Sequence, residues 1–122
     1  VMQQNMRPGV TEQELWAHLH AAAIRRGAEW IETRLLSSGP RTNPWFQECS
    51  SRVIEAGDLV AFDTDLIGAY GYCADISRTW LCGERRASKA QIDLYRRARE
   101  QIAYNLELVR CIALRRIRRL IL

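Results

Sequence analysis

Two apolar segments, separated by residues 68–71, carry three aspartates and constrain this chain more than any other feature. Asp63 and Asp65 lie in the first segment and Asp75 in the second, among aliphatic and aromatic residues typical of strands. The glycines between the segments predict a chain reversal and therefore an antiparallel hairpin. Burying this much negative charge is costly unless a cation compensates it, so the hairpin predicts a metal site.

Strand geometry brings the three carboxylates to one face. Successive side chains of a strand alternate, so Asp63 and Asp65 project the same way, about 6 to 7 Å apart. A hairpin that reverses at residues 68–71 places Asp75 opposite or diagonal to Asp65. Three oxygen donors then converge, and oxygen donors suit Mn, Fe or Co better than Cu.

Composition predicts one globular domain. The chain has 122 residues, 48% hydrophobic and 26% charged. Residues 110–122 hold five arginines and no acid. The remaining residues hold 13 Lys or Arg against 14 Asp or Glu, so the formal charge of +4 belongs to the tail.

No apolar run approaches the roughly 18 residues of a membrane span, and no signal peptide is evident, so we expect a cytoplasmic location. Because the sequence starts at Val1 and not at Met, we expect that upstream sequence is missing.

Helix signals precede the hairpin. The Arg-Pro-Gly sequence at residues 7–9 is a strong break that ends a first helical segment. Thr11 followed by Glu14 is a capping-box pattern that predicts a second helix. Gly27 is the expected end of this helix.

A strand and a further helix complete the expected fold. Residues 30–36 are rich in β-branched, aromatic and aliphatic side chains, which predicts a strand. A long helix is expected after Ser88, because apolar residues recur there every three to four positions. The predicted class is α+β, with an antiparallel hairpin flanked by helices.

The segment between this strand and the hairpin is a loop with two adjacent aromatic residues. It runs over residues 37–49 and contains Trp45 and Phe46. Such a loop either packs down over the core or lines a pocket, and the residues leave both readings open.

Three motifs, taken in chain order, resemble one known family. They are Arg-Pro-Gly-Val-Thr-Glu at residues 7–12, Gly-Asp-Leu-Val at residues 57–60, and Gly-Tyr-Cys-Ala-Asp-Ile-Ser-Arg-Thr at residues 71–79. Together they resemble the pita-bread metalloenzymes, which include methionine aminopeptidase, prolidase, aminopeptidase P and creatinase. The resemblance covers about residues 1–109 and implies the N-terminal part of a pita-bread catalytic domain.

The resemblance implies a site for two divalent ions (Fe, Mn, Co or Zn), held by two aspartates of this hairpin together with a histidine and two glutamates from the later half of the fold. Asp75 takes the place of the second aspartate. Typical members have the first aspartate eleven residues earlier, which here is Thr64, whereas Asp65 and Asp63 lie ten and twelve residues before Asp75. Peptidase members also carry a histidine in the loop before residues 57–58, and this loop has none.

These departures, with the loop sequence, look most like the dimethylsulfoniopropionate lyase branch of the family. In that branch three aspartates of this region serve the metals, which implies Asp63, Asp65 and Asp75 as ligands. The enzyme cleaves its substrate to dimethyl sulfide and acrylate. The alternatives are a fragment of an aminopeptidase P or prolidase-like peptidase, and a non-catalytic pita-bread binding module.

A small sulfonium substrate would suit an aromatic pocket, because a cation is attracted to ring faces. The candidate residues for substrate binding are Trp45, Phe46, Tyr70 and Tyr72. The resemblance places the catalytic base beyond residue 109.

Residues 110–122 depart from the family pattern. We expect a partial catalytic domain at residues 1–109 and a basic tail at residues 110–122, explained by out-of-frame translation. Read by itself, the tail is a basic amphipathic segment suited to an anionic membrane or RNA. Because the family's histidine and two glutamates are absent, we expect this chain to be inactive alone. The complete protein is expected to be a homodimer with a small-molecule substrate and no nucleic-acid or membrane partner.

Overall fold

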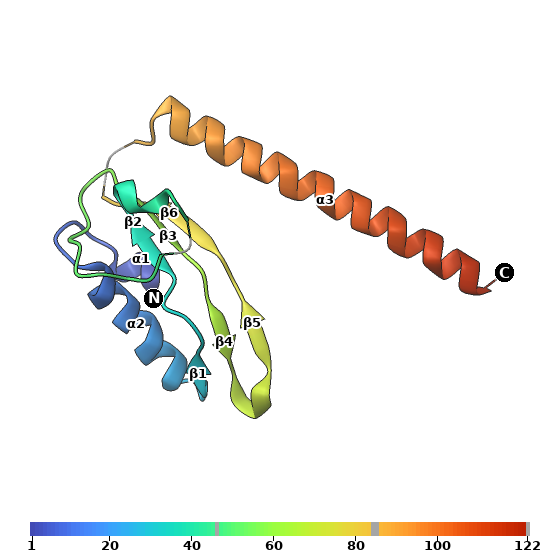
Figure 1. Ribbon diagram of the computed structural model, residues 1–122, viewed down its shortest axis with the longest axis horizontal. Helices are drawn as coiled ribbons and strands as arrows, with labels where there is room; N and C mark the ends of the chain where they lie inside the picture. The colour runs from blue at the N-terminus through green and yellow to red at the C-terminus, as the bar shows by residue number, and fades with distance from the viewer. Residues whose placement is uncertain (46, 84–85, 122) are drawn as a thin grey trace. The chain divides into compact units, whose positions relative to one another are not determined.

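The computed structural model describes residues 1–45, 47–83 and 86–121, with side chains described as far as residue 112. The chain divides into two compact units, Val1–Arg86 and Ala87–Leu122. The first unit contains the described strands, and the second is a long helix (Figure 1).

Two helices begin the first unit. Helix α1 (Met2–Asn5) ends before the predicted break. Helix α2 (Glu12–Ile24) begins at the predicted capping box: the backbone N–H of Glu14 donates to Thr11 Oγ1 (3.1 Å), and the N–H of Thr11 donates to Glu14 Oε2 (2.7 Å). Gly27 follows the last turn with a φ of 82°, so the predicted start and end of this helix are confirmed.

Short strands form two antiparallel sheets. The strands are β1 (Trp30–Ile31), β2 (Leu36–Ser38), β3 (Leu59–Phe62), β4 (Asp65–Ile67), β5 (Cys73–Asp75) and β6 (Arg78–Leu81). One sheet has the order β1-β4-β5 and the other β2-β3-β6. The 3₁₀ turn η1 (Gly39–Thr42) follows β2, and η2 (Ala69–Gly71) forms the turn between β4 and β5.

The predicted hairpin is confirmed and runs through both sheets. Strands β3 and β4 follow one another along its first arm, and β5 and β6 along its second (Figure 1). The register is the same in both sheets, because Phe62 pairs with Arg78 and Asp65 pairs with Asp75.

The single strand predicted at residues 30–36 is wrong, because this segment is divided between the two sheets. Strand β1 pairs Ile31 with Leu66, whereas β2 pairs Leu36 with Phe62. The four residues between these pairs therefore face only three residues of the hairpin. One extra residue on one strand is the arrangement of a β-bulge, which interrupts regular pairing.

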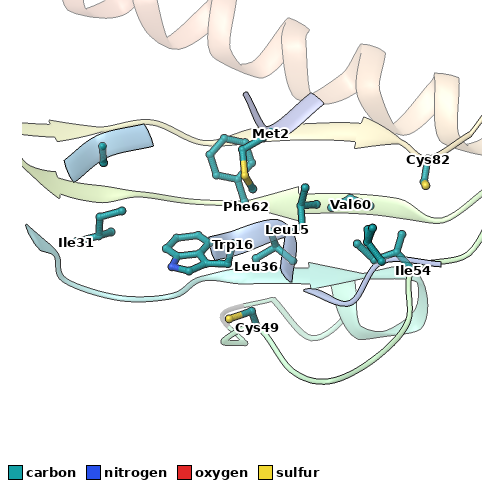
Figure 2. Packing of buried hydrophobic residues seen from close by; sticks show 12 residues of the cluster. Met2, Leu15, Trp16, Ile31, Leu36, Cys49, Ile54, Val60, Phe62 and Cys82 are labelled. Carbon is teal, nitrogen blue, oxygen red and sulfur yellow. The ribbon is translucent and has the colours of Figure 1, made fainter. Parts of the chain in front are cut away.

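Residues of α2, including Leu15 and Trp16, pack with residues of the strands to form the core, as the labelled side chains in Figure 2 show. Phe62 stacks on Trp80 with ring centroids 5.0 Å apart, which joins the two arms of the hairpin. Among the side chains that the structure describes, the apolar residues with no exposed surface are Leu15, Leu36, Ile54, Val60 and Cys82.

The second unit contains helix α3 (Lys89–Ile121). Its predicted start is confirmed by a reciprocal cap, because the N–H of Gln91 donates to Ser88 Oγ (3.2 Å) and the N–H of Ser88 donates to Gln91 Oε1 (2.7 Å). Within the described part of the chain, no helix is both long and apolar enough to cross a membrane.

Candidate metal centre

The hairpin ladder is unbroken at the level of the aspartates. Thr64 and Ile76 exchange both backbone hydrogen bonds, with N···O distances of 3.2 and 3.1 Å. The next pair, Asp65 opposite Asp75, is therefore a non-hydrogen-bonded pair, whose side chains lie closer together than those of a bonded pair. The predicted opposition of Asp65 and Asp75 is confirmed.

Asp63 is held by two donors on the same side of the ladder. The hydroxyl of Ser77 donates to Asp63 Oδ1 at 2.6 Å, from the strand position opposite Asp63. The backbone N–H of Thr64 donates to the same oxygen at 3.2 Å. These bonds fix the orientation of the carboxylate relative to the hairpin.

The electrostatics of this face are those of crowded negative charge. The charge of Asp63 raises the pKa of Asp75, and partial dehydration and the charge of Asp65 raise it further. A divalent cation relieves such repulsion, and carboxylate oxygens fit hard divalent cations. Within residues 1–45, 47–83 and 86–121, however, no three His, Cys, Asp or Glu side chains lie in an arrangement that could hold a metal ion.

The opposite face of the hairpin is apolar. Thr64 is almost fully buried there, and its Oγ1 donates to the carbonyl oxygen of Ile76 at 3.3 Å. Residue 64 therefore faces away from the three aspartates. It lines an apolar cavity of about 170 Å³ with Leu19, Ala23, Ile31, Phe62, Leu66 and Ile76.

The segment before β2 connects Asp63 to the end of the loop that contains Trp45. The backbone N–H of Asp63 donates to the carbonyl oxygen of Leu35 at 2.9 Å. Leu35 in turn forms an isolated antiparallel β-bridge with Glu48, and the backbone N–H of Cys49 donates to the carbonyl oxygen of Arg34 at 2.8 Å. The end of the loop thus lies beside the strand segment that pairs with Asp63.

The predicted substrate-binding residues fall in different places. Trp45 lies in the loop with 38% of its surface exposed, and Phe46 lies outside the described residues. Tyr70 and Tyr72 lie at the hairpin turn and are 94% and 79% exposed. The end of the loop lies beside Leu35, which pairs with Asp63, whereas the two tyrosines lie at the turn beyond Asp65 and Asp75.

Sequence reasoning missed two residues that organise this region, Ser77 and Glu12. Ser77 had a usable signal, because it stands two residues after Asp75 on the same face of a predicted strand. Glu12 had none, because the partners of its carboxylate lie 26, 29 and 38 residues away in sequence.

Comparison with known proteins identifies the family. The chain matches Metallopeptidase family M24 over residues 1–114, and it therefore belongs to this family of metal-dependent pita-bread enzymes. The resemblance inferred from the motifs is confirmed.

Proteins similar to this chain include two lyases and a dipeptidase of known structure. The chain is 52% identical over 100 residues to dimethylsulfoniopropionate lyase DddP from Roseovarius nubinhibens, covering 82% of this chain and 22% of that protein. It is 52% identical over 103 residues to the DddP of Roseobacter denitrificans, covering 84% and 23%. Among solved structures, the Xaa-Pro dipeptidase from Bacillus anthracis is similar with a TM-score of 0.68 and 35% identity, covering 78% of this chain and 26% of that one. The chain thus spans less than a quarter of the length of these two lyases.

Proposed function

We propose that this chain is a fragment of a metal-dependent C–S lyase that cleaves dimethylsulfoniopropionate to dimethyl sulfide and acrylate. The observation that carries this proposal is the 52% identity to two dimethylsulfoniopropionate lyases over a segment that includes the aspartate hairpin. The position of Thr64 supports it, because the site of the first aspartate in typical peptidase members is here a buried residue on the other face of the hairpin.

The metal ligands that we propose are Asp63, Asp65 and Asp75. Their shared face and the raised pKa of Asp75 support this assignment, since both reflect carboxylates close enough to repel one another. In the complete protein a histidine and two glutamates would complete the set for two ions, which we assign to Fe, Mn, Co or Zn. When bound, these ions would polarise the substrate carboxylate and make the neighbouring carbon more acidic.

The reaction that we propose is a β-elimination. A base removes a proton from the carbon beside the carboxylate, and the electron pair of that C–H bond forms the double bond of acrylate. The C–S bond breaks at the same time, and its electrons leave on sulfur as neutral dimethyl sulfide. We place the base beyond residue 109, as the family resemblance implies.

We propose that an aromatic residue of the loop holds the sulfonium group. Trp45 is the best placed, because its loop ends beside the segment that pairs with Asp63. A ring face attracts a cation, and the sulfonium group carries the positive charge of the substrate until the electrons of the C–S bond neutralise it. Phe46, Tyr70 and Tyr72 remain candidates for the complete protein.

The context of the complete protein is also part of the proposal. We place it in the cytoplasm as a homodimer that acts on a small molecule, with no nucleic-acid or membrane partner. Residues 110–122 are proposed to be out-of-frame translation at the end of a partial domain of residues 1–109. Reading the gene in the other two frames near codon 110 tests this, and the absence there of a proline-glycine break followed by an amphipathic helix would contradict it.

A chimera tests the lyase assignment. Residues 1–109 would replace the matching segment of the Roseovarius nubinhibens lyase, with Asp65→Asn in the same chimera as the matched inactive control. We expect dimethyl sulfide in the headspace from the chimera, little from the control, and none above background from the 122-residue chain alone. A folded chimera that releases no dimethyl sulfide would contradict the proposal.

The second candidate is a prolidase-like peptidase, favoured by the 35% identity to the Xaa-Pro dipeptidase from Bacillus anthracis. The same chimera distinguishes the two, because release of proline from an X-Pro dipeptide without dimethyl sulfide would support the peptidase. Equilibrium dialysis that finds no bound metal in the chimera would instead favour a non-catalytic module.

A further inference from the structure

Glu12 is a buried carboxylate in the first turn of α2. Its side chain has no exposed surface. Burial alone would raise its pKa, but hydrogen bonds from Ser50, Ser38 and Arg41 lower the pKa overall. A carboxylate so placed stays ionised and depends on its donors, because a buried charge without partners is strongly destabilising.

The donors to Glu12 come from both ends of the segment that we name the aromatic loop, residues 39–49. Ser38, just before the loop, donates to Oε1 from its backbone N–H and its hydroxyl, both at 2.8 Å. Ser50, just after the loop, donates to Oε2 from its N–H at 2.9 Å and its hydroxyl at 2.7 Å. One carboxylate therefore ties together the two ends of the loop.

A third donor links Glu12 to the interior of the loop. The guanidinium of Arg41 forms an ion pair with Glu12 Oε2 and also donates to the carbonyl oxygen of Glu48 at 2.9 Å. Inside the loop, the amide of Gln47 donates to the carbonyl oxygens of Arg41 (3.1 Å) and Pro44 (2.8 Å). These bonds lie on both sides of Trp45 in sequence.

The start of α2 is attached to the segment that follows the loop. The backbone N–H of Glu12 donates to the carbonyl oxygen of Arg52 at 3.0 Å, and that of Gln13 donates to the carbonyl oxygen of Ser50 at 3.1 Å. The first helical N–H groups thus find partners outside the helix. Helix α2 packs on the core through Leu15 and Trp16. The contacts between α2 and the ends of the loop therefore fix the position of the loop relative to the core.

We infer that Glu12 is a positioning residue, whose buried carboxylate holds the aromatic loop and Trp45 in a fixed place beside the strand of Asp63. The role of the loop in holding substrate rests on the proposed function, whereas the dependence of the loop on Glu12 does not. A carboxylate that merely stabilised the fold or the helix N-terminus would leave the conformation of the loop unchanged in the folded protein.

The first test uses the 122-residue chain labelled with 5-fluorotryptophan. Its four tryptophans give separate ¹⁹F resonances, and Trp45→Phe assigns the one from the loop. In Glu12→Gln we expect the Trp45 resonance to move, while those of Trp16, Trp30 and Trp80 stay in place. Amide hydrogen exchange of residues 39–49 should become about tenfold faster or more, because the loop loses its charged anchor.

The matched control is Glu14→Gln. Glu14 lies in the same helical turn, but its carboxylate accepts hydrogen bonds from Thr11 and is exposed to solvent. The Glu14→Gln variant should have the same Trp45 resonance, and the same rate of amide hydrogen exchange in residues 39–49, as the parent chain. If the folded Glu12→Gln chain also matches the parent, or if all four resonances and all segments change together, the positioning role is wrong.

A second variant keeps the test decisive if Glu12→Gln does not fold. Ser50→Ala removes one donor at the end of the loop and keeps the carboxylate. It should move the Trp45 resonance in the same direction by a smaller amount, and an unchanged resonance would overturn the inference.

The functional consequence is tested in the lyase chimera. Glu12→Gln should raise KM for the sulfonium substrate more than it lowers kcat, because the loop binds substrate and supplies no reacting group. A chimera with native Glu12 that lacks lyase activity would refute the proposed function and leave the loop result standing. An active chimera whose KM is insensitive to Glu12→Gln would instead refute the role of the loop.

Discussion

The hydroxyl of Ser77 lies 2.6 Å from Oδ1 of Asp63, across the two arms of the hairpin. A short hydrogen bond to an ionised oxygen is among the stronger polar contacts in proteins. It fixes one carboxylate of the acidic face, and outer partners of this kind orient metal ligands. Ser77 is therefore expected to support the proposed ligand Asp63.

Replacing Ser77 should weaken metal binding. We expect Ser77→Ala to lower Mn²⁺ affinity about tenfold and Ser77→Thr, which keeps the hydroxyl, to retain it. Titration followed by Mn²⁺ electron paramagnetic resonance measures both. Thr79→Val removes a hydroxyl from the next position on the same face and serves as the control. An equal loss in this control would show a general effect on the sheet.

Removing one charge from the acidic face should stabilise the metal-free fold and abolish metal binding. The raised pKa of Asp75 means that the folded state disfavours its ionised form, chiefly because of Asp63. Without metal at neutral pH, Asp75→Asn should therefore raise the thermal unfolding midpoint, and it should abolish any further rise on adding Mn²⁺. Circular dichroism melts with and without metal measure both, and a lower midpoint for the metal-free variant would contradict the repulsion.

Placing an acid at residue 64 should not restore the spacing of the peptidases. Thr64 is almost fully buried against an apolar cavity, so Thr64→Asp should lower the free energy of unfolding by about 3 kcal/mol. Thr64→Val, which loses the hydroxyl bond to Ile76, should cost about 1 kcal/mol. Urea unfolding measures both. A well-folded Thr64→Asp chain with tighter Mn²⁺ binding would show that residue 64 can reach the acidic face.

The features that sequence could predict are those fixed by near neighbours. Alternation within one strand placed Asp63 and Asp65 together, and a four-residue pattern located the capping box of Thr11 and Glu14. The reversal at residues 68–71 set the register that pairs Asp65 with Asp75.

The features that sequence could not predict depend on distant partners. The division of residues 30–36 follows from one extra residue opposite the hairpin, which becomes visible only when both registers are known. The burial of Glu12 contradicts the usual exposure of a charged residue, and its donors are far away in sequence. Propensity and periodicity carry no information about either arrangement.

Gly39 should be intolerant of a side chain. Its φ is +54°, and a Cβ would lie 2.5 Å from Asp58 Oδ1 and 2.8 Å from a guanidinium nitrogen of Arg52. Those two side chains form an ion pair at 2.6 Å, so they cannot both withdraw without losing it. We expect Gly39→Ala to lower the free energy of unfolding by about 2 to 3 kcal/mol.

The control for this variant is Gly9→Ala. Gly9 also has a positive φ, +96°, but no atom lies within 4 Å of an added Cβ. It should cost about 1 kcal/mol from backbone strain alone. Equal losses in the two variants would show that the clash with the ion pair contributes nothing.

The stabilisation from Glu12 should depend on pH in a defined direction. Its pKa is lowered in the folded chain from the ordinary value of 4.5, so its contribution is present above that value and is lost as pH falls through the folded-state pKa. Glu12→Gln removes this dependence. The parent should therefore exceed Glu12→Gln by about 3 kcal/mol in free energy of unfolding at neutral pH, and the difference should shrink below pH 4.5. Urea unfolding at a series of pH values measures the difference. A difference that stays constant through the acid range would mean that the folded chain does not favour the ionised carboxylate, and the buried network around Glu12 would need another explanation.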